Sequence, residues 1–112
     1  MGLNSYEIVV TPSAESDVDE ILDYITDELC NAEAAQSFFD KLLKGFDRIA
    51  AFPYAMPVLR CALLQENANL RRMDIDNFVV IYCIDQALCK VHILAVFYAV
   101  SEFMYNLIRR IE

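Results

Sequence analysis

Two arginine pairs, two tyrosines and one histidine are the side chains of this sequence whose chemistry could serve a function. They are Arg71-Arg72, Arg109-Arg110, Tyr82, Tyr98 and His92. Guanidinium groups can hold an acidic partner, and phenol and imidazole groups can transfer protons. Cleavage of a phosphodiester would need a base, or an electrostatic substitute for one, together with cations near the developing charge. The sequence is poor in that combination, which favours contact with a partner over catalysis.

Each of these groups also has a structural interpretation. Arg71 and Arg72 either anchor a sheet edge to a carboxylate such as Asp74 or Asp76, or contact a partner, and the sequence favours neither. For the two tyrosines, packing in the core or at its rim is favoured over a contact role. The lone histidine lies within a predicted strand, where we expect a packed or edge position rather than a catalytic one.

Four cysteines add no metal site to this set. They are Cys30, Cys61, Cys83 and Cys89. No two have the CxxC spacing and only one histidine is present, so neither a zinc site nor a cofactor is expected. Buried or half-buried free thiols are the expected state. Cys83 and Cys89 flank the same predicted turn and could approach each other, but the cytoplasm would keep them reduced.

The segment from Leu70 to Tyr98 predicts three antiparallel strands. The strands are Leu70–Ile75, Phe78–Ile84 and Val91–Tyr98. The second and third are rich in Val, Ile, Phe and Tyr, the first is a shorter segment ahead of them, and turns at Asp76-Asn77 and 85–88 separate the three. On the central strand, one face is expected to carry Val79, Ile81 and Cys83, and the other Phe78, Val80, Tyr82 and Ile84. Because both faces are apolar, the sheet needs a cover on each side.

An N-terminal strand over 6–10 and two amphipathic helices precede this sheet. Thr11-Pro12 is a typical helix start, and an apolar stripe follows at Ala14, Val18, Ile21, Leu22, Ile25 and Leu29. The outward face is expected to carry Glu15, Asp17, Asp19, Glu20, Asp23, Asp27 and Glu28. That face is interpreted as solvated, with a docking surface for a basic partner as the alternative. Asn31 is expected to cap a second helix through about Ala51.

The element order predicts a single α+β domain over residues 1–112. In this two-layer fold an N-terminal strand is followed by an antiparallel helical hairpin packed on an antiparallel sheet, in the order β-α-α-β-β-β. Ser101 could begin a short C-terminal helix with Arg109-Arg110 near its negative end. That helix is too short to cover the second sheet face. Either the face is exposed or something else lies on it, a partner protein being the natural candidate.

Composition and charge exclude several classes of protein. The chain has 112 residues, 57% of them hydrophobic, which is enough for a folded core and excludes disorder. Its apolar runs are shorter than the ~20 residues of a membrane-spanning helix, and the N-terminus lacks a signal peptide, so a cytoplasmic protein without a membrane partner is expected. A net charge of −8 disfavours direct binding of nucleic acid along a broad basic groove.

Short motifs from about Tyr6 to about Leu107 form an ordered set. They are Tyr6-x-Ile8-x-x-Thr11-Pro12-x-Ala14, Asp19-x-Ile21-x-x-Tyr24-Ile25, Asn31-x-x-Ala34-Ala35-x-x-Phe38, Phe52-Pro53, the run from Leu70-Arg71-Arg72-Met73 to Ile84-Asp85, and Val91-x-Ile93-x-x-Val96-Phe97-Tyr98. Together they resemble the RelE/ParE toxin superfamily, most closely its ParE-like plasmid-stabilisation branch. The fold of that superfamily matches the element order read from the residues.

The resemblance implies the toxin of a type II toxin–antitoxin system, neutralised by a small cognate antitoxin that wraps across its surface. It implies contact with operator DNA only indirectly, through the antitoxin, and DNA gyrase as the target of the ParE-like branch. The residues then expected to contact antitoxin or target are Arg71, Arg72, Tyr82, Tyr98, Arg109 and Arg110. A homodimer formed through the open sheet face in the absence of antitoxin is a further alternative.

Departures from the RelE-like pattern leave three hypotheses. RelE-like members look like ribosome-dependent mRNA endonucleases, with a basic residue where this chain has Val79. The segment after Tyr98, which is typically basic in both branches, reads Ala99-Val100-Ser101-Glu102 here. The first hypothesis is a ParE-like toxin that binds and inhibits its target without chemistry of its own. The second is a RelE-like nuclease with an atypical site, which the charge of −8 disfavours near ribosomal RNA. The third is a toxin fold whose activity has decayed.

Overall fold

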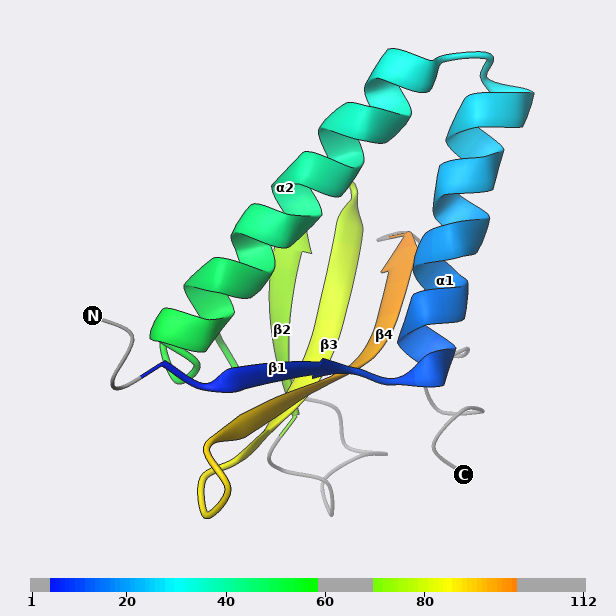
Figure 1. Cartoon of the computed structure of the whole chain (residues 1–112). Coiled ribbons are helices and arrows are strands. Elements are labelled where there is room, and N and C mark those ends of the chain that lie inside the picture. The colour runs from blue at the N-terminus through cyan, green and yellow to red at the C-terminus, as the bar shows by residue number, and fades with distance from the viewer. Residues whose placement is uncertain (1–4, 59–69, 99–112) are drawn as a thin grey trace.

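The structure, a computed structural model, describes residues 5–58 and 70–98. Its elements are β1 (Glu7–Val10), α1 (Pro12–Asp23), the π-helical turn η2 (Tyr24–Glu28), α2 (Ala32–Ala51), β2 (Leu70–Ile75), β3 (Phe78–Asp85) and β4 (Lys90–Tyr98) (Figure 1). The predicted order β-α-α-β-β-β is confirmed. The predicted helix from Ser101 lies outside the described residues, as do Arg109 and Arg110. None of the described helices is long and apolar enough to cross a membrane.

The four strands form one sheet in the order β1-β4-β3-β2. The three antiparallel strands predicted from the sequence are confirmed, with Met73 opposite Val80 and Ile81 opposite Ala95. β1 instead pairs in parallel with β4, so the sheet is mixed and not wholly antiparallel as predicted. A parallel pairing needs a long crossover, and the two helices between β1 and the meander supply it.

Side-chain caps begin both helices where the sequence predicts them. The Thr11 hydroxyl accepts from the Ala14 amide at 3.2 Å and donates to the Ile93 carbonyl at 2.8 Å. The Asn31 side chain accepts from the Ala34 amide at 3.0 Å. The caps satisfy amides that have no partner within the helix, and Thr11 also fastens the start of α1 to β4.

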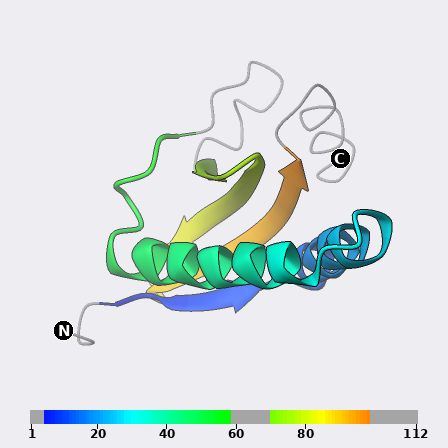
Figure 2. The ribbon, with the colours of Figure 1, turned by 90° about the horizontal axis from the view of Figure 1, so that it is seen from above.

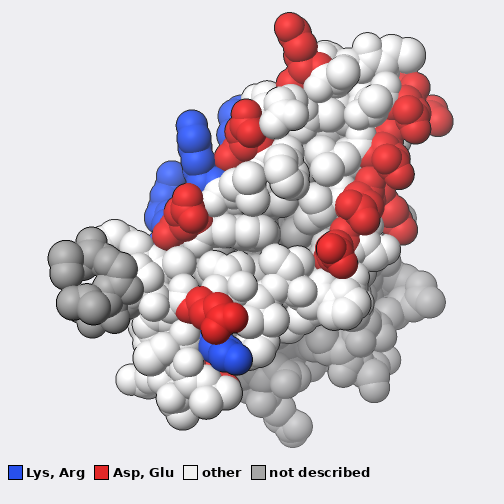
Figure 3. All heavy atoms as spheres, viewed as in Figure 1, with Lys and Arg blue, Asp and Glu red and all other residues white. Residues whose placement is uncertain are grey.

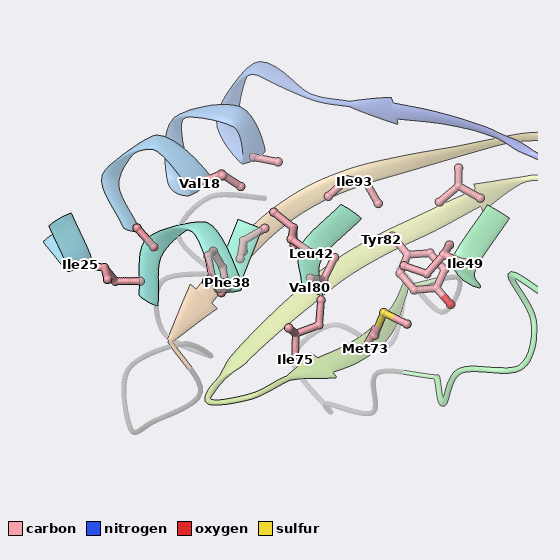
Figure 4. Close-up of a cluster of buried hydrophobic side chains, with 14 residues drawn as sticks. Val18, Ile25, Phe38, Leu42, Ile49, Met73, Ile75, Val80, Tyr82 and Ile93 are labelled. Carbon is pink, nitrogen blue, oxygen red and sulfur yellow. The ribbon is translucent and has the colours of Figure 1, made fainter. Parts of the chain in front are cut away.

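Both helices lie on one face of the sheet and share a core with it (Figure 2). Figure 4 shows side chains from α1, α2 and the strands meeting in this core, among them Val18, Phe38, Leu42, Val80 and Ile93. α2 approaches β2 closely at Gly45, where an added Cβ would lie 2.9 Å from the Ile75 Cδ1. The absence of a side chain there lets the helix backbone come down onto the strand.

Tyr82 belongs to this core and has no exposed surface. Its hydroxyl donates to the Pro53 carbonyl at 2.8 Å. The packing role is therefore the one observed for Tyr82 in this structure, and its predicted contact with an antitoxin or target stays a prediction. A tyrosine ring can fill the core while its hydroxyl satisfies a carbonyl of the segment that follows α2.

The second face of the sheet is not an open apolar surface. Val79, Ile81 and Ala95 have no exposed surface within the chain, and none belongs to the core under the helices. Of the two alternatives drawn from the sequence, the burial of these three side chains supports a covered face. Water is an unfavourable neighbour for a strand that is apolar on both sides, and burial of both faces removes that cost.

Asp17 does not lie on the outward face of α1, where the sequence placed it. The residue is only 9% exposed, and its Oδ2 accepts from the Val96 amide at 3.0 Å. β1 ends at Val10, opposite Ile93, so within the described residues the edge of β4 beyond that point has no neighbouring strand. α1 runs beside this edge, and Asp17 provides the acceptor that a strand would otherwise supply.

We expect Asp17→Ala to lower the free energy of unfolding by about 1–3 kcal/mol, because it leaves a buried backbone donor without this acceptor. Asp17→Asn keeps an oxygen at the same place and should lose less. Urea unfolding of both variants measures the difference, with Asp19→Ala on the exposed side of the same helix as the control. Equal losses in the alanine and asparagine variants would contradict the role assigned to the carboxylate.

Burial raises the pKa of Tyr82 from its ordinary value of 10.0 to about 12, against a smaller lowering by the charge of Arg71. The folded state therefore holds this proton more tightly than the unfolded state. Stability that is fully present below pH 10 is expected to fall as the pH rises from 10 toward 12.

Urea midpoints measured across this pH range should show a smaller decline in Tyr82→Phe than in the unaltered chain. Tyr98→Phe, which changes a half-exposed tyrosine of the same sheet, should decline as the unaltered chain does. A decline of the same size in Tyr82→Phe would show that other groups cause it.

Candidate partner-binding groove

A groove of about 1320 Å³ opens between the joined ends of the helices and the ends of β3 and β4. Its lining residues come from α1, η2, α2, the β2–β3 turn and the last residues of β4. The large apolar side chains among them are Ile21, Tyr24, Ile25, Leu29, Phe38, Phe78, Phe97 and Tyr98. Large apolar side chains therefore make up much of the groove's lining.

The helical wall of the groove is shaped by the π-helical turn η2. The predicted apolar stripe of this helix holds at Ala14, Val18 and Ile25, which are buried. Leu29, the last member of the stripe, is 55% exposed, and Tyr24 is 56% exposed. A π-helical turn holds more residues than an α-helical one, so it rotates the side chains that follow it. Leu29 consequently leaves the core and lines the groove.

The sheet wall of the groove carries Phe78 and Tyr98, whose rings continue a series of ring contacts that starts in the core at Phe38 of α2. The ring centroids of Phe38 and Phe78 lie 4.7 Å apart, and those of Phe78 and Tyr98 lie 5.4 Å apart in an edge-on arrangement. Phe38 is buried, whereas Tyr98 is 52% exposed. Ring contacts of this kind hold Tyr98 in a fixed position, which suits a preformed contact surface.

Carboxylates border the groove on both sides. Glu20 lies on the α1 side, and Asp76 lies in the β2–β3 turn, where the Lys41 ammonium pairs with it at 3.1 Å. Figure 3 shows a stripe of aspartate and glutamate along the α1 side of the molecule. The described residues that line the groove include no lysine or arginine. The α1 side of the groove is therefore acidic.

The predicted arginine pair does not reach the groove. The Arg71 guanidinium donates to the carbonyls of Tyr54 and Met56 and lies 5.2 Å from the centre of the Tyr54 ring. Arg72 pairs with Asp74 at 2.7 Å, as the structural interpretation expected, whereas Asp76 pairs with Lys41 instead. Both guanidinium groups thus have partners within the fold, and a contact role for them stays a prediction.

A smaller cavity of about 510 Å³ lies near the other end of the β3–β4 hairpin. It is lined in part by Tyr54, Arg71, Cys83, Asp85 and His92. His92 is half-buried opposite Cys83 on the neighbouring strand, which is the packed position expected for it. Burial, followed by the nearby Asp85 charge, raises the pKa of the Cys83 thiol. A thiol in this environment stays protonated and is a poor nucleophile.

The free thiols are more exposed than the sequence suggested. Cys83 is half-buried as expected, but Cys30 and Cys89 are exposed, and all three are free. Both exposed cysteines have positive φ angles, 50° for Cys30 and 54° for Cys89, which places them in turns and not in the core. Cys61 lies outside the described residues.

Of the predicted contact residues within the described ranges, only Tyr98 lines the groove. Tyr24, Leu29 and Phe78 also line the groove and were not singled out from the sequence, where Leu29 and Phe78 have the spacing of ordinary core positions. The sequence carries a weak signal for the groove. Leu29 closes the apolar stripe only two residues before the helix cap Asn31, where a side chain is most easily left without a covering layer.

Comparisons with solved structures agree on the fold. The toxin–antitoxin complex RelBE2 from Mycobacterium tuberculosis is 18% identical, with a TM-score of 0.57 over 84% of this chain and 98% of that one. The chromosomal ParDE system from P. aeruginosa is 15% identical, with a TM-score of 0.67 over 87% and 99%. The isolated E. coli RelE toxin is 12% identical, with a TM-score of 0.54 over 96% and 100%.

The family of this chain is shown by its sequence. No curated protein matches the chain at a significant level. The family model described as ParE toxin of type II toxin-antitoxin system, parDE, matches residues 8–100, which is most of the chain and includes both walls of the groove. This chain therefore belongs to the ParE toxin family of type II toxin–antitoxin systems.

Proposed function

We propose that this toxin acts by binding and inhibiting a cellular target such as DNA gyrase, without chemistry of its own, and that a cognate antitoxin neutralises it. The observation that carries the proposal is that the side chains suited to RNA cleavage are bound to other groups of the fold. Arg71 is held by two carbonyls, Arg72 by Asp74, and the Tyr82 hydroxyl by Pro53. Groups held in this way support the fold and are poorly placed to stabilise a reacting phosphate.

The large groove supports a function based on binding. Three large apolar side chains at its edge are more than half exposed, and clustered exposed apolar surface usually marks an interaction site. Burial of such surface contributes roughly 25 cal/mol per Å² to docking. Two of the similar structures, RelBE2 and ParDE, are described as toxin–antitoxin systems, which supports an antitoxin as one partner of this chain.

A ribosome-dependent mRNA endonuclease of the RelE type is the second candidate. The smaller cavity favours it, because Arg71, His92 and the Tyr54 side chain lie together there and offer a cation, an imidazole and a phenol. The carbonyl partners of Arg71 and the net charge of −8 work against it, since the enzyme would have to approach RNA.

Expression of this chain alone in a bacterium is expected to arrest growth and to cause accumulation of gyrase-cleaved DNA while bulk mRNA stays intact. Co-expression of the small protein encoded beside it should restore growth. Val80→Asp, which places a charge in the fully buried core, serves as the unfolded control and should not arrest growth.

Cleavage of mRNA on translating ribosomes, lost in Arg71→Ala or His92→Ala, would replace the proposal with the nuclease. Unimpaired growth in the presence of verified soluble chain would contradict both candidates and leave a toxin fold with decayed activity.

A further inference from the structure

The groove is larger than a site for a small molecule. Ligand pockets for small molecules usually measure about 300–1,000 Å³, whereas this groove measures about 1320 Å³ and is lined by several large apolar side chains. Tyr24, Leu29 and Tyr98 stand around it, each more than half exposed. The space and the apolar edge fit several side chains of one polypeptide segment, inserted between η2 and the end of the β3–β4 hairpin.

The charged residues on the α1 side of the groove are all acidic. From Pro12 to Glu28 the sequence of α1 and η2 contains no lysine or arginine, and Glu20, Asp23 and Asp27 are exposed along it. The acidic group on the opposite side, Asp76, is already paired with Lys41. A segment rich in carboxylates would be repelled from the α1 side, whereas a basic segment would be attracted to it.

From these two features we infer that the groove receives an amphipathic antitoxin segment whose apolar side chains enter between Leu29 and Tyr98 and whose lysines or arginines face Glu20 and the acidic stripe of α1. This inference rests on the proposed function, because it names the antitoxin as the occupant. It adds the site, the side-chain pattern and the sign of the charge that the antitoxin must present there.

Two synthetic peptides test the pattern directly. Both carry the same leucines at helical spacing, and the flanking positions are lysine in one and glutamate in the other. At low salt the lysine peptide is expected to bind this chain at least about tenfold more tightly than the glutamate peptide, and added salt should reduce the difference. Equal binding of the two peptides, or stronger binding of the glutamate peptide, would overturn the inference.

Two variants of the chain locate the site, and each has a matched control. Leu29→Asp should weaken binding of the lysine peptide and of the neighbour-encoded small protein by about tenfold or more. Leu88→Asp changes a leucine of similar exposure in the β3–β4 turn, away from the groove, and should have little effect. Glu20→Lys should weaken both interactions, whereas Asp47→Lys, which makes the same change in net charge on the outer side of α2, should not.

The same measurements separate this inference from the proposed function. If the neighbour-encoded protein restores growth and binds the chain, but binds Leu29→Asp and Glu20→Lys as tightly as the unaltered chain, the proposed function stands and the inferred site is wrong. If that protein neither binds nor restores growth, the antitoxin assignment fails. The peptide pair then still decides whether the groove selects a basic amphipathic segment, and preference for the lysine peptide lost in Leu29→Asp would support it.

Discussion

The structure depends on the burial of β3 on both of its faces. Val79, Val80, Ile81 and Tyr82 follow one another along this strand, point alternately to the two faces and have no exposed surface. A strand of this kind must be central, with neighbours on both edges and a layer on both sides. β2 and β4 fill the edges, and the helical hairpin forms one layer. The alternation of charged and apolar residues from Arg72 to Ile75 in β2 helps to fix the register, since a slip of one residue would turn Arg72 toward the core.

The groove follows from how the covering layer fits the sheet. The helices extend past the ends of the strands at their joined end, as Figure 1 shows. Apolar side chains at this end, such as Tyr24 and Leu29, line the groove together with the aromatic residues of β3 and β4. The same helical layer that covers the core thus also exposes apolar surface beside the groove. Its acidic outer face limits the molecules that can use that surface, because it repels acidic ones.

The polar groups near the start of β2 hold the segment that follows α2 against the sheet. Arg71 and the Tyr82 hydroxyl hold carbonyls in the 53–56 segment, which leaves α2 through a proline and crosses the end of the sheet. The Pro53 carbonyl is buried and needs a donor, which the Tyr82 hydroxyl provides. Arg71 donates to the more exposed carbonyls of Tyr54 and Met56. A function based on docking is compatible with this arrangement, because docking requires a stable apolar surface and not a set of free reactive groups. The fold and the proposed mode of action therefore both require side chains that hold the structure rigid and keep an apolar surface in place.

The sequence by itself determined the features that depend on neighbours along the chain. The helix caps at Thr11 and Asn31, the turn at Asp76 and the three antiparallel strands are set by local hydrogen bonds and side-chain periodicity. Only the tertiary structure decided that β1 lies parallel to β4, that Asp17 is buried and that Leu29 leaves the core. Each of these depends on which distant segment lies alongside, and periodicity within one helix or strand carries no information about that neighbour.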